Sequence, residues 1–200
     1  MEIQSYNKPA REQWPEIVQR PVADSTSLEK TVRKILQKVK DKGDKAIRKY
    51  AKEFDGVKLK QFAVSEKEIK NAASLISDEL KIAIQQAKSN IETFHLSQKE
   101  EIKKIETMPG IECWRRSVGI EKVGLYIPGG SAPLFSTVLM LGVPAQLAGC
   151  KEIVLCTPPS KEGSIHPAIL FAASVCGITK IFRAGGVQAI GAMAYGTETI

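Results

Sequence analysis

The second half of the chain repeats a unit of strand, loop and helix, and this repeat restricts the fold more than any other feature of the sequence. Apolar segments typical of strands lie at residues 123–127, 152–156 and 180–183, about 27 to 30 residues apart. Segments typical of helices follow them, over about residues 136–148, 167–176 and 187 onward. This spacing is characteristic of βαβ units, so the strands should lie parallel with right-handed crossovers.

Residues 1–106 have a helical pattern instead, and we expect them to form a region separate from residues 107–200. Apolar side chains recur there at helical spacing, and Gly43 is a suitable helix stop. Ser65 with Glu68 matches a capping box at the start of a further helix. Other residues with N-capping side chains precede predicted helices at 24–27 and at 77–78.

The start of the second region predicts extended structure. Pro109–Gly110 should form a turn. Residues 111–117 and 120–127 have the pattern of two strands joined by a short turn at Val118–Gly119. We therefore expect a hairpin whose second strand is the first strand of the parallel sheet.

Composition excludes several classes of protein. Hydrophobic residues make up 43% and charged residues 26%, as in globular proteins. No apolar run reaches the roughly 18 residues that cross a bilayer, and Met1 to Lys8 is polar, so we expect a cytoplasmic protein without a membrane partner. The net charge is +7, but the lysines are mixed with acidic residues and aromatic residues are only 6%, which argues against a nucleic-acid partner.

The four cysteines do not indicate a metal site or a thiol mechanism. They lie at Cys113, Cys150, Cys156 and Cys176, and none forms a CxxC pair. No histidine lies at a recognisable motif spacing to activate one of them. Reduced, mostly buried thiols are therefore expected.

Two glycine loops follow predicted strands, Pro128–Gly129–Gly130 and Gly185–Gly186. Ligands of open α/β sheets bind outside the carboxyl ends of the strands, and a helix N-terminus attracts anionic groups. A nucleotide is therefore a reasonable ligand. Neither loop matches the G-x-G-x-x-G or Walker pattern, so a tight turn that needs glycine for steric reasons is the alternative.

Longer motifs make the family recognisable. The sequence resembles the N-terminal part of histidinol dehydrogenase over nearly its whole length. The motifs that carry the resemblance are VGLYIPGGSAPLFSTVLM at 123–140, VPAQLAGC at 143–150, VLCTPP at 154–159, GGVQAI at 185–190 and AYGT at 194–197, with YAKEFD at 50–55 and NIETFH at 90–95 in the helical region. Val187 departs from the family, in which alanine is common at this position.

The resemblance implies an α/β fold with a helical N-terminal region followed by an incomplete Rossmann-like parallel sheet, truncated at its C-terminus. It implies the NAD-dependent, zinc-requiring oxidation of L-histidinol to L-histidine via the aldehyde, the last steps of histidine biosynthesis. The full-length family members are homodimers with interleaved subunits.

The family's zinc ligands and its acid/base Glu-His pair lie beyond residue 200, so we assign no catalytic or metal residue here and expect the chain alone to be inactive. A nucleotide-binding module without turnover is the alternative function.

The resemblance also implies roles for individual residues. Tyr126 and Gln188 should contact NAD. From residue type alone, Tyr126 would be a core aromatic residue with a hydrated hydroxyl, and Gln188 would face solvent. Phe54 should reach the adenine side, with core packing as the alternative. Pro128, Gly129 and Gly130 should shape the pocket wall.

The two histidines are not assigned to the site. His95 lies at the end of a predicted helix without an Asp, Glu or His cluster around it, and His166 lies in a loop before Pro167. We expect neither to be catalytic or a metal ligand.

Overall fold

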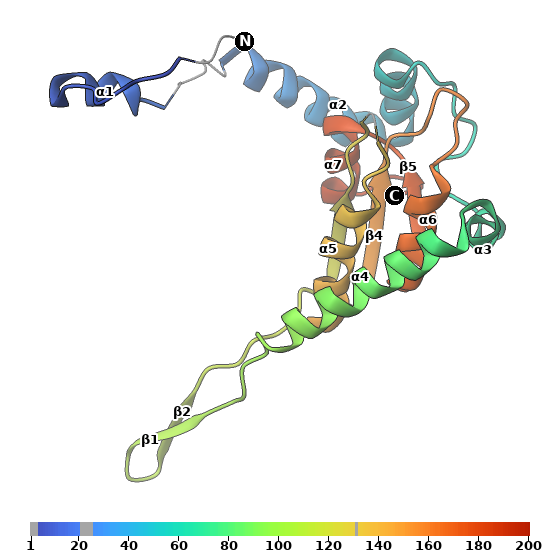
Figure 1. Ribbon diagram of the computed structural model, residues 1–200. Coiled ribbons are helices and arrows are strands. Elements are labelled where there is room, and N and C mark those ends of the chain that lie inside the picture. The colour runs from blue at the N-terminus through green and yellow to red at the C-terminus, as the bar shows by residue number, and fades with distance from the viewer. Residues whose placement is uncertain (1–3, 21–25, 131) are drawn as a thin grey trace.

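A three-stranded parallel sheet lies at the centre of the molecule. The computed structural model describes residues 4–20, 26–130 and 132–200 (Figure 1). The strands are β3 (Lys122–Tyr126), β4 (Glu152–Thr157) and β5 (Lys180–Arg183), in the order β3-β4-β5. Both pairs are parallel, with Leu125 opposite Leu155 and Leu155 opposite Ile181. The α/β fold with a parallel sheet, predicted from the βαβ spacing, is confirmed.

Helices cover both faces of this sheet. On one face lie α5 (Phe135–Leu147) and α6 (Pro167–Val175), with α4 (Asp78–Leu96) packed against them. On the other face α7 (Gly186–Tyr195) packs against α2 (Thr26–Tyr50). Successive strand residues enter opposite cores: Leu155 and Ile181 join the first, and Cys156 and Phe182 join the second. Side chains alternate in this way along every strand, so a sheet covered on both faces needs apolar residues at consecutive positions.

The N-terminal region is helical, as predicted. After α2 come a π-helical turn at Ala51–Asp55, α3 (Glu66–Asn71) and a 3-10 turn at Ala72–Leu75. The capping box at the start of α3 is present: the Glu68 N–H donates to Ser65 Oγ at 3.2 Å, and the Ser65 N–H donates to Glu68 Oε2 at 2.9 Å. Ser77 caps α4 with its side chain alone, as its Oγ accepts a 3.3 Å hydrogen bond from the Leu80 N–H. Of the caps predicted at 24–27, positions 24 and 25 lie outside the described residues.

Helix α2 is interrupted at Gly43, where the predicted stop lies. The backbone of Gly43 is at φ 49° and ψ −132°, outside the helical region. The next residue, Asp44, is buried and accepts hydrogen bonds from the hydroxyls of Thr197 and Thr199. Residues 197–199, which follow α7, thus bind α2 at the residue after its interruption.

The predicted hairpin pairing was wrong. Strand β2 (Ile111–Trp114) pairs antiparallel with β1 (Lys104–Met108), not with residues 120–127. The Pro109–Gly110 turn joins them, because Gly110 adopts φ 81°, which glycine tolerates without strain. The helical pattern ends at Leu96, so the boundary predicted near residue 106 lies inside β1.

Two segments project from the body as arms (Figure 1). The hairpin arm is β1-β2, and every residue of both strands is exposed. The N-terminal arm holds a 3-10 turn at Arg11–Gln13 and α1 (Trp14–Ile17), which bury no residue. Within the described part of the chain, no helix combines the length and apolar character that crossing a membrane requires.

Candidate functional site

The loops after the three parallel strands meet at one edge of the sheet. Pro158, which follows β4, packs against Gly129 after β3 and Gly185 after β5. A Cβ on Gly129 would lie 2.8 Å from Pro158 Cγ, and a Cβ on Gly185 would lie 2.7 Å from Pro158 Cβ. Both distances are shorter than van der Waals contact, so these two positions exclude a side chain. The steric reason for glycine therefore holds at both positions, and the exposed Gly129 also presents its backbone to the space above the sheet edge.

This space is a hollow of about 390 Å³. Pro128, Gly129 and Gly130, the predicted pocket wall, lie together in its lining. The rest of the described lining includes Thr157 at the end of β4, the following residues Pro158, Pro159 and Ser160, Asp55 from the helical region, and His166, the N-cap of α6. The structure thus brings three of the six predicted cofactor residues onto one concave surface at the carboxyl ends of the strands, where α/β sheets bind ligands.

Tyr126 and Gln188 come together at the start of α7, beside this hollow but outside its lining. The Gly186 N–H donates a hydrogen bond of 2.8 Å to the Tyr126 hydroxyl. Gly186 has φ +60°, and a Cβ there would lie 2.8 Å from Gln188 Oε1. The two residues predicted to contact NAD are therefore neighbours around one glycine, although 60 positions separate Tyr126 from Gly186 in the chain.

The Gln188 side chain does not face solvent. Only 1% of the residue is exposed, and within the described residues its Oε1 is buried without a hydrogen-bond partner. A buried amide oxygen without a donor costs free energy. A donor group of a ligand, or a water, would remove this cost if it reached the amide past the Gly185–Gly186 loop, so the residue is suited to a cofactor role.

Phe54 is not a core residue. It is 55% exposed and stacks on the Tyr50 ring, with centroids 5.3 Å apart and planes 6° from parallel. Its outer face is free to receive another flat ring. Phe54 lies outside the lining of the hollow, whereas the next residue, Asp55, lies in it.

Asp55 and Pro158 are the site residues that sequence reasoning missed. Asp55–Gly56 has the sequence of a turn, and Pro158 falls within a family motif. Neither signal indicates that a residue of the helical region meets the loop after β4. That proximity follows from the packing of α2 against α7, which a local pattern does not reveal.

The cysteines and histidines form no reactive arrangement. Burial raises the pKa of the Cys156 thiol to about 12 and that of Cys176 to about 11, so neither is a thiolate at neutral pH. His166 caps α6, since its Nδ1 accepts a 3.2 Å hydrogen bond from the Ala168 N–H. His95 contacts Gln98 at 2.7 Å on the surface. Among residues 4–20, 26–130 and 132–200, no three His, Cys, Asp or Glu side chains gather as a metal site requires.

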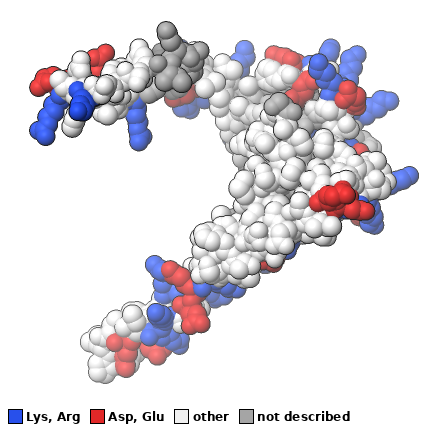
Figure 2. Space-filling model, in the orientation of Figure 1, with Lys and Arg blue, Asp and Glu red and all other residues white. Residues whose placement is uncertain are grey.

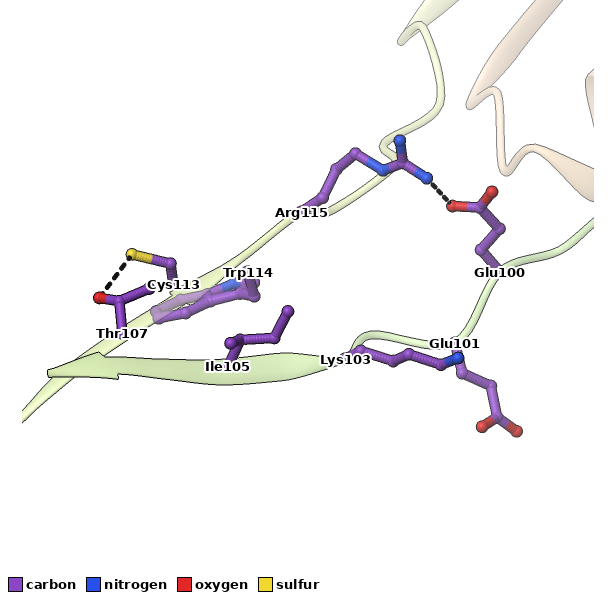
Figure 3. A pocket seen from close by; sticks show the side chains of 8 residues that line it. All are labelled: Glu100, Glu101, Lys103, Ile105, Thr107, Cys113, Trp114 and Arg115. Carbon is purple, nitrogen blue, oxygen red and sulfur yellow. Dashed lines mark hydrogen bonds and ion pairs between the residues drawn. The ribbon is translucent and has the colours of Figure 1, made fainter.

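A larger hollow, of about 790 Å³, lies on the hairpin arm (Figure 3). Ile105 and Trp114 form its apolar part, an Arg115–Glu100 ion pair lies at one end, and the exposed Cys113 thiol contacts Thr107 at 3.9 Å. It lies on the arm rather than at the carboxyl edge of the parallel sheet. Figure 2 shows basic and acidic side chains interspersed on the arms, and a mostly uncharged centre, so the visible face carries no continuous basic surface.

Comparison with known proteins identifies the family. The family model described as histidinol dehydrogenase matches residues 18–200. The chain belongs to the histidinol dehydrogenase family. This confirms the resemblance predicted from the motifs at 123–140 and 185–190.

Relatives within the histidinol dehydrogenase family agree in sequence and structure. Histidinol dehydrogenase of Bacteroides thetaiotaomicron is 63% identical over 192 residues, and that of Escherichia coli is 47% identical over 199 residues. The chain spans about 45% of the length of each of these relatives. The crystal structure of histidinol dehydrogenase from Elizabethkingia anophelis superposes with a TM-score of 0.93 at 55% identity, covering 98% of this chain and 46% of that one.

Proposed function

We propose that this chain is the cofactor-binding part of an NAD-dependent histidinol dehydrogenase, an enzyme that oxidises L-histidinol to L-histidine through the aldehyde. Family membership supports the reaction class. The sheet edge carries the proposal: Gly129 and Gly185 exclude side chains there, and Gln188 Oε1, a buried amide oxygen without a partner among the described residues, lies beside Gly186. These features are suited to a nucleotide with flat rings, hydroxyls and phosphates.

In this proposal each residue has a physical task. Pro128, Gly129 and Gly130 form the wall along which the cofactor backbone lies. The Gln188 amide hydrogen-bonds the cofactor, and the Tyr126 ring borders it from β3. The exposed ring of Phe54 stacks on the adenine side. When bound, NAD accepts a hydride from the substrate carbon.

Zinc does not fit the residues present, since no ligand set exists among those described. We propose that its ligands and the acid/base residues lie beyond residue 200, in the part of the family that this chain does not cover. The 200-residue chain alone should therefore have no turnover. The full-length protein is proposed to be a cytoplasmic homodimer.

The test compares the 200-residue chain with a full-length protein that contains it. We expect NADH to appear when histidinol, NAD and zinc are added to the full-length protein, and none above blank with the short chain. Turnover by the short chain would contradict the assignment of the chemistry to the remaining sequence. Inactivity of a folded, zinc-loaded full-length protein would contradict the proposed reaction.

A nucleotide-binding module without turnover remains the second candidate function, because all six proposed contacts lie within this chain. The binding module and the dehydrogenase differ only in what the full-length protein does, because a binding module would bind NAD but leave histidinol unchanged. The same experiment therefore separates the two.

A further inference from the structure

Asp55 lines the hollow and has a buried carboxylate oxygen that no other described residue satisfies. It ends the π-helical turn after α2 and lines the hollow with Pro128, Gly129 and Gly130. Its Oδ2 is buried and lacks a hydrogen-bond partner among the described residues, and Asp55 forms no ion pair within them. Burial also raises the pKa of this carboxyl above its usual value. Asp55 as a whole is half-buried, but a carboxylate oxygen buried without a donor is unfavourable, which points to a ligand that supplies donors.

The position of Asp55 depends on Gly185. A Cβ on Gly185 would lie 3.3 Å from Asp55 Oδ1, so the absence of a side chain lets the carboxylate approach the loop that opens α7. Pro158 packs against the same glycine, at 2.7 Å from the Cβ position. Asp55 thus stands at the end of the concave surface formed by the three loops, on the side of the exposed Phe54 ring.

An ionised carboxylate accepts hydrogen bonds and donates none. Its two oxygens match the two hydroxyls of a ribose, and a carboxylate has this role in dinucleotide-binding folds. A phosphate ester at the same place would bring a second negative charge against it without a donor. A metal ion would require more oxygen or nitrogen ligands than Asp55 and His166, the two candidate ligand side chains in the described lining.

We propose that Asp55 accepts hydrogen bonds from the adenosine ribose hydroxyls of the cofactor and thereby selects NAD over NADP. This inference rests on the proposed function. It adds that the selecting residue comes from the helical region, upstream of the sheet, and that the 2′-phosphate of NADP is rejected by charge.

The experiment measures binding of NAD and of NADP to the zinc-loaded full-length protein, wild type and Asp55→Asn. We expect the wild type to bind NAD at least about tenfold more tightly than NADP, and Asp55→Asn to weaken NAD binding about tenfold and to remove most of the preference. Glu53→Gln is the matched control, because it removes an exposed carboxylate two residues away that pairs with Lys49 at 3.7 Å. It should behave as wild type.

A cofactor analogue tests the same contact without relying on the variant. NAD that lacks the adenosine 2′-hydroxyl should bind the wild type about tenfold more weakly than NAD itself. Asp55 has no selecting role if the analogue binds as NAD does, or if folded Asp55→Asn keeps the wild-type preference. A wild type that binds neither dinucleotide would instead contradict the proposed function.

Discussion

Gly129 and Gly130 are neighbours in the chain but have different surroundings. A Cβ on Gly129 would lie 2.8 Å from Pro158, whereas a Cβ on Gly130 would meet its nearest atom, the Ala132 carbonyl oxygen, at 3.9 Å. We expect Gly129→Ala to destabilise the protein by about 1–3 kcal/mol, the usual effect of overpacking, and Gly130→Ala to have little effect. Urea unfolding followed by circular dichroism measures both. Equal stability of the two variants would mean that Pro158 yields easily.

Gln188 allows a test of the proposed cofactor surface. Gln188→Ala in the full-length protein should weaken NAD binding by about 1–3 kcal/mol, because the cofactor loses its partner amide, while histidinol binding should change little. NAD and histidinol are titrated separately into the zinc-loaded protein. Gln86→Ala is the control, because Gln86 is an exposed glutamine of α4 that donates a 2.8 Å hydrogen bond to Asn90. Unchanged NAD affinity in a folded Gln188→Ala would show that the pocket has been placed wrongly.

At the residue scale, the places of the glycine loops at the strand ends could be predicted better than the burial and the neighbours of single side chains. The glycines of both loops were correctly placed at the carboxyl ends of strands, because local pattern and βαβ spacing determine that arrangement. The burial of Gln188 and the lining role of Asp55 could not be predicted. Both depend on contacts between the helical region and α7, which have no periodic signature in the sequence.

Helix α3 shows an element whose start the sequence predicts. Ser65 caps it, and Glu68 of the same box also pairs with the buried Arg183 at the end of β5, so the cap connects the helical region to the sheet. We expect Ser65→Ala to lower the free energy of unfolding by about 0.5–2 kcal/mol, the range for lost N-caps.

Chemical denaturation provides the measurement for Ser65→Ala. Ser89→Ala, at an exposed position inside α4, should be neutral or slightly stabilising, because alanine is the better helix former. Comparable losses in both variants would mean that the cap contributes nothing beyond helix propensity.

The hairpin shows where element prediction fails. Residues 104–108, KIETM, do not alternate between polar and apolar side chains, and a hairpin on an arm has no buried face to distinguish one register from another. The side-chain pattern of residues 111–117 therefore does not decide between residues 104–108 and residues 120–127 as the paired strand. The turn at Pro109–Gly110 decides the pairing, because two residues close a hairpin and Gly110 supplies the positive φ.

At the scale of the molecule, the body and the arms differ in what they bury. The body encloses two cores, one on each face of the sheet. The arms leave large apolar side chains in solvent, among them Ile105, Met108 and Trp114 on the hairpin. Such exposure is typical of surfaces that another part of a protein covers, and the proposed homodimer and the longer relatives offer two ways to cover them.

The arms also hold both tryptophans of the chain. Trp14 is 50% exposed on the N-terminal arm and Trp114 is 55% exposed on the hairpin arm. Indole emission from the 200-residue chain should therefore lie close to that of the unfolded chain and shift little in urea, while far-UV circular dichroism loses the helical signal. The same two rings become reporters of assembly: a shift of their emission to shorter wavelength in the full-length protein would show that the arms have moved into an apolar environment, independently of whether the sheet is folded.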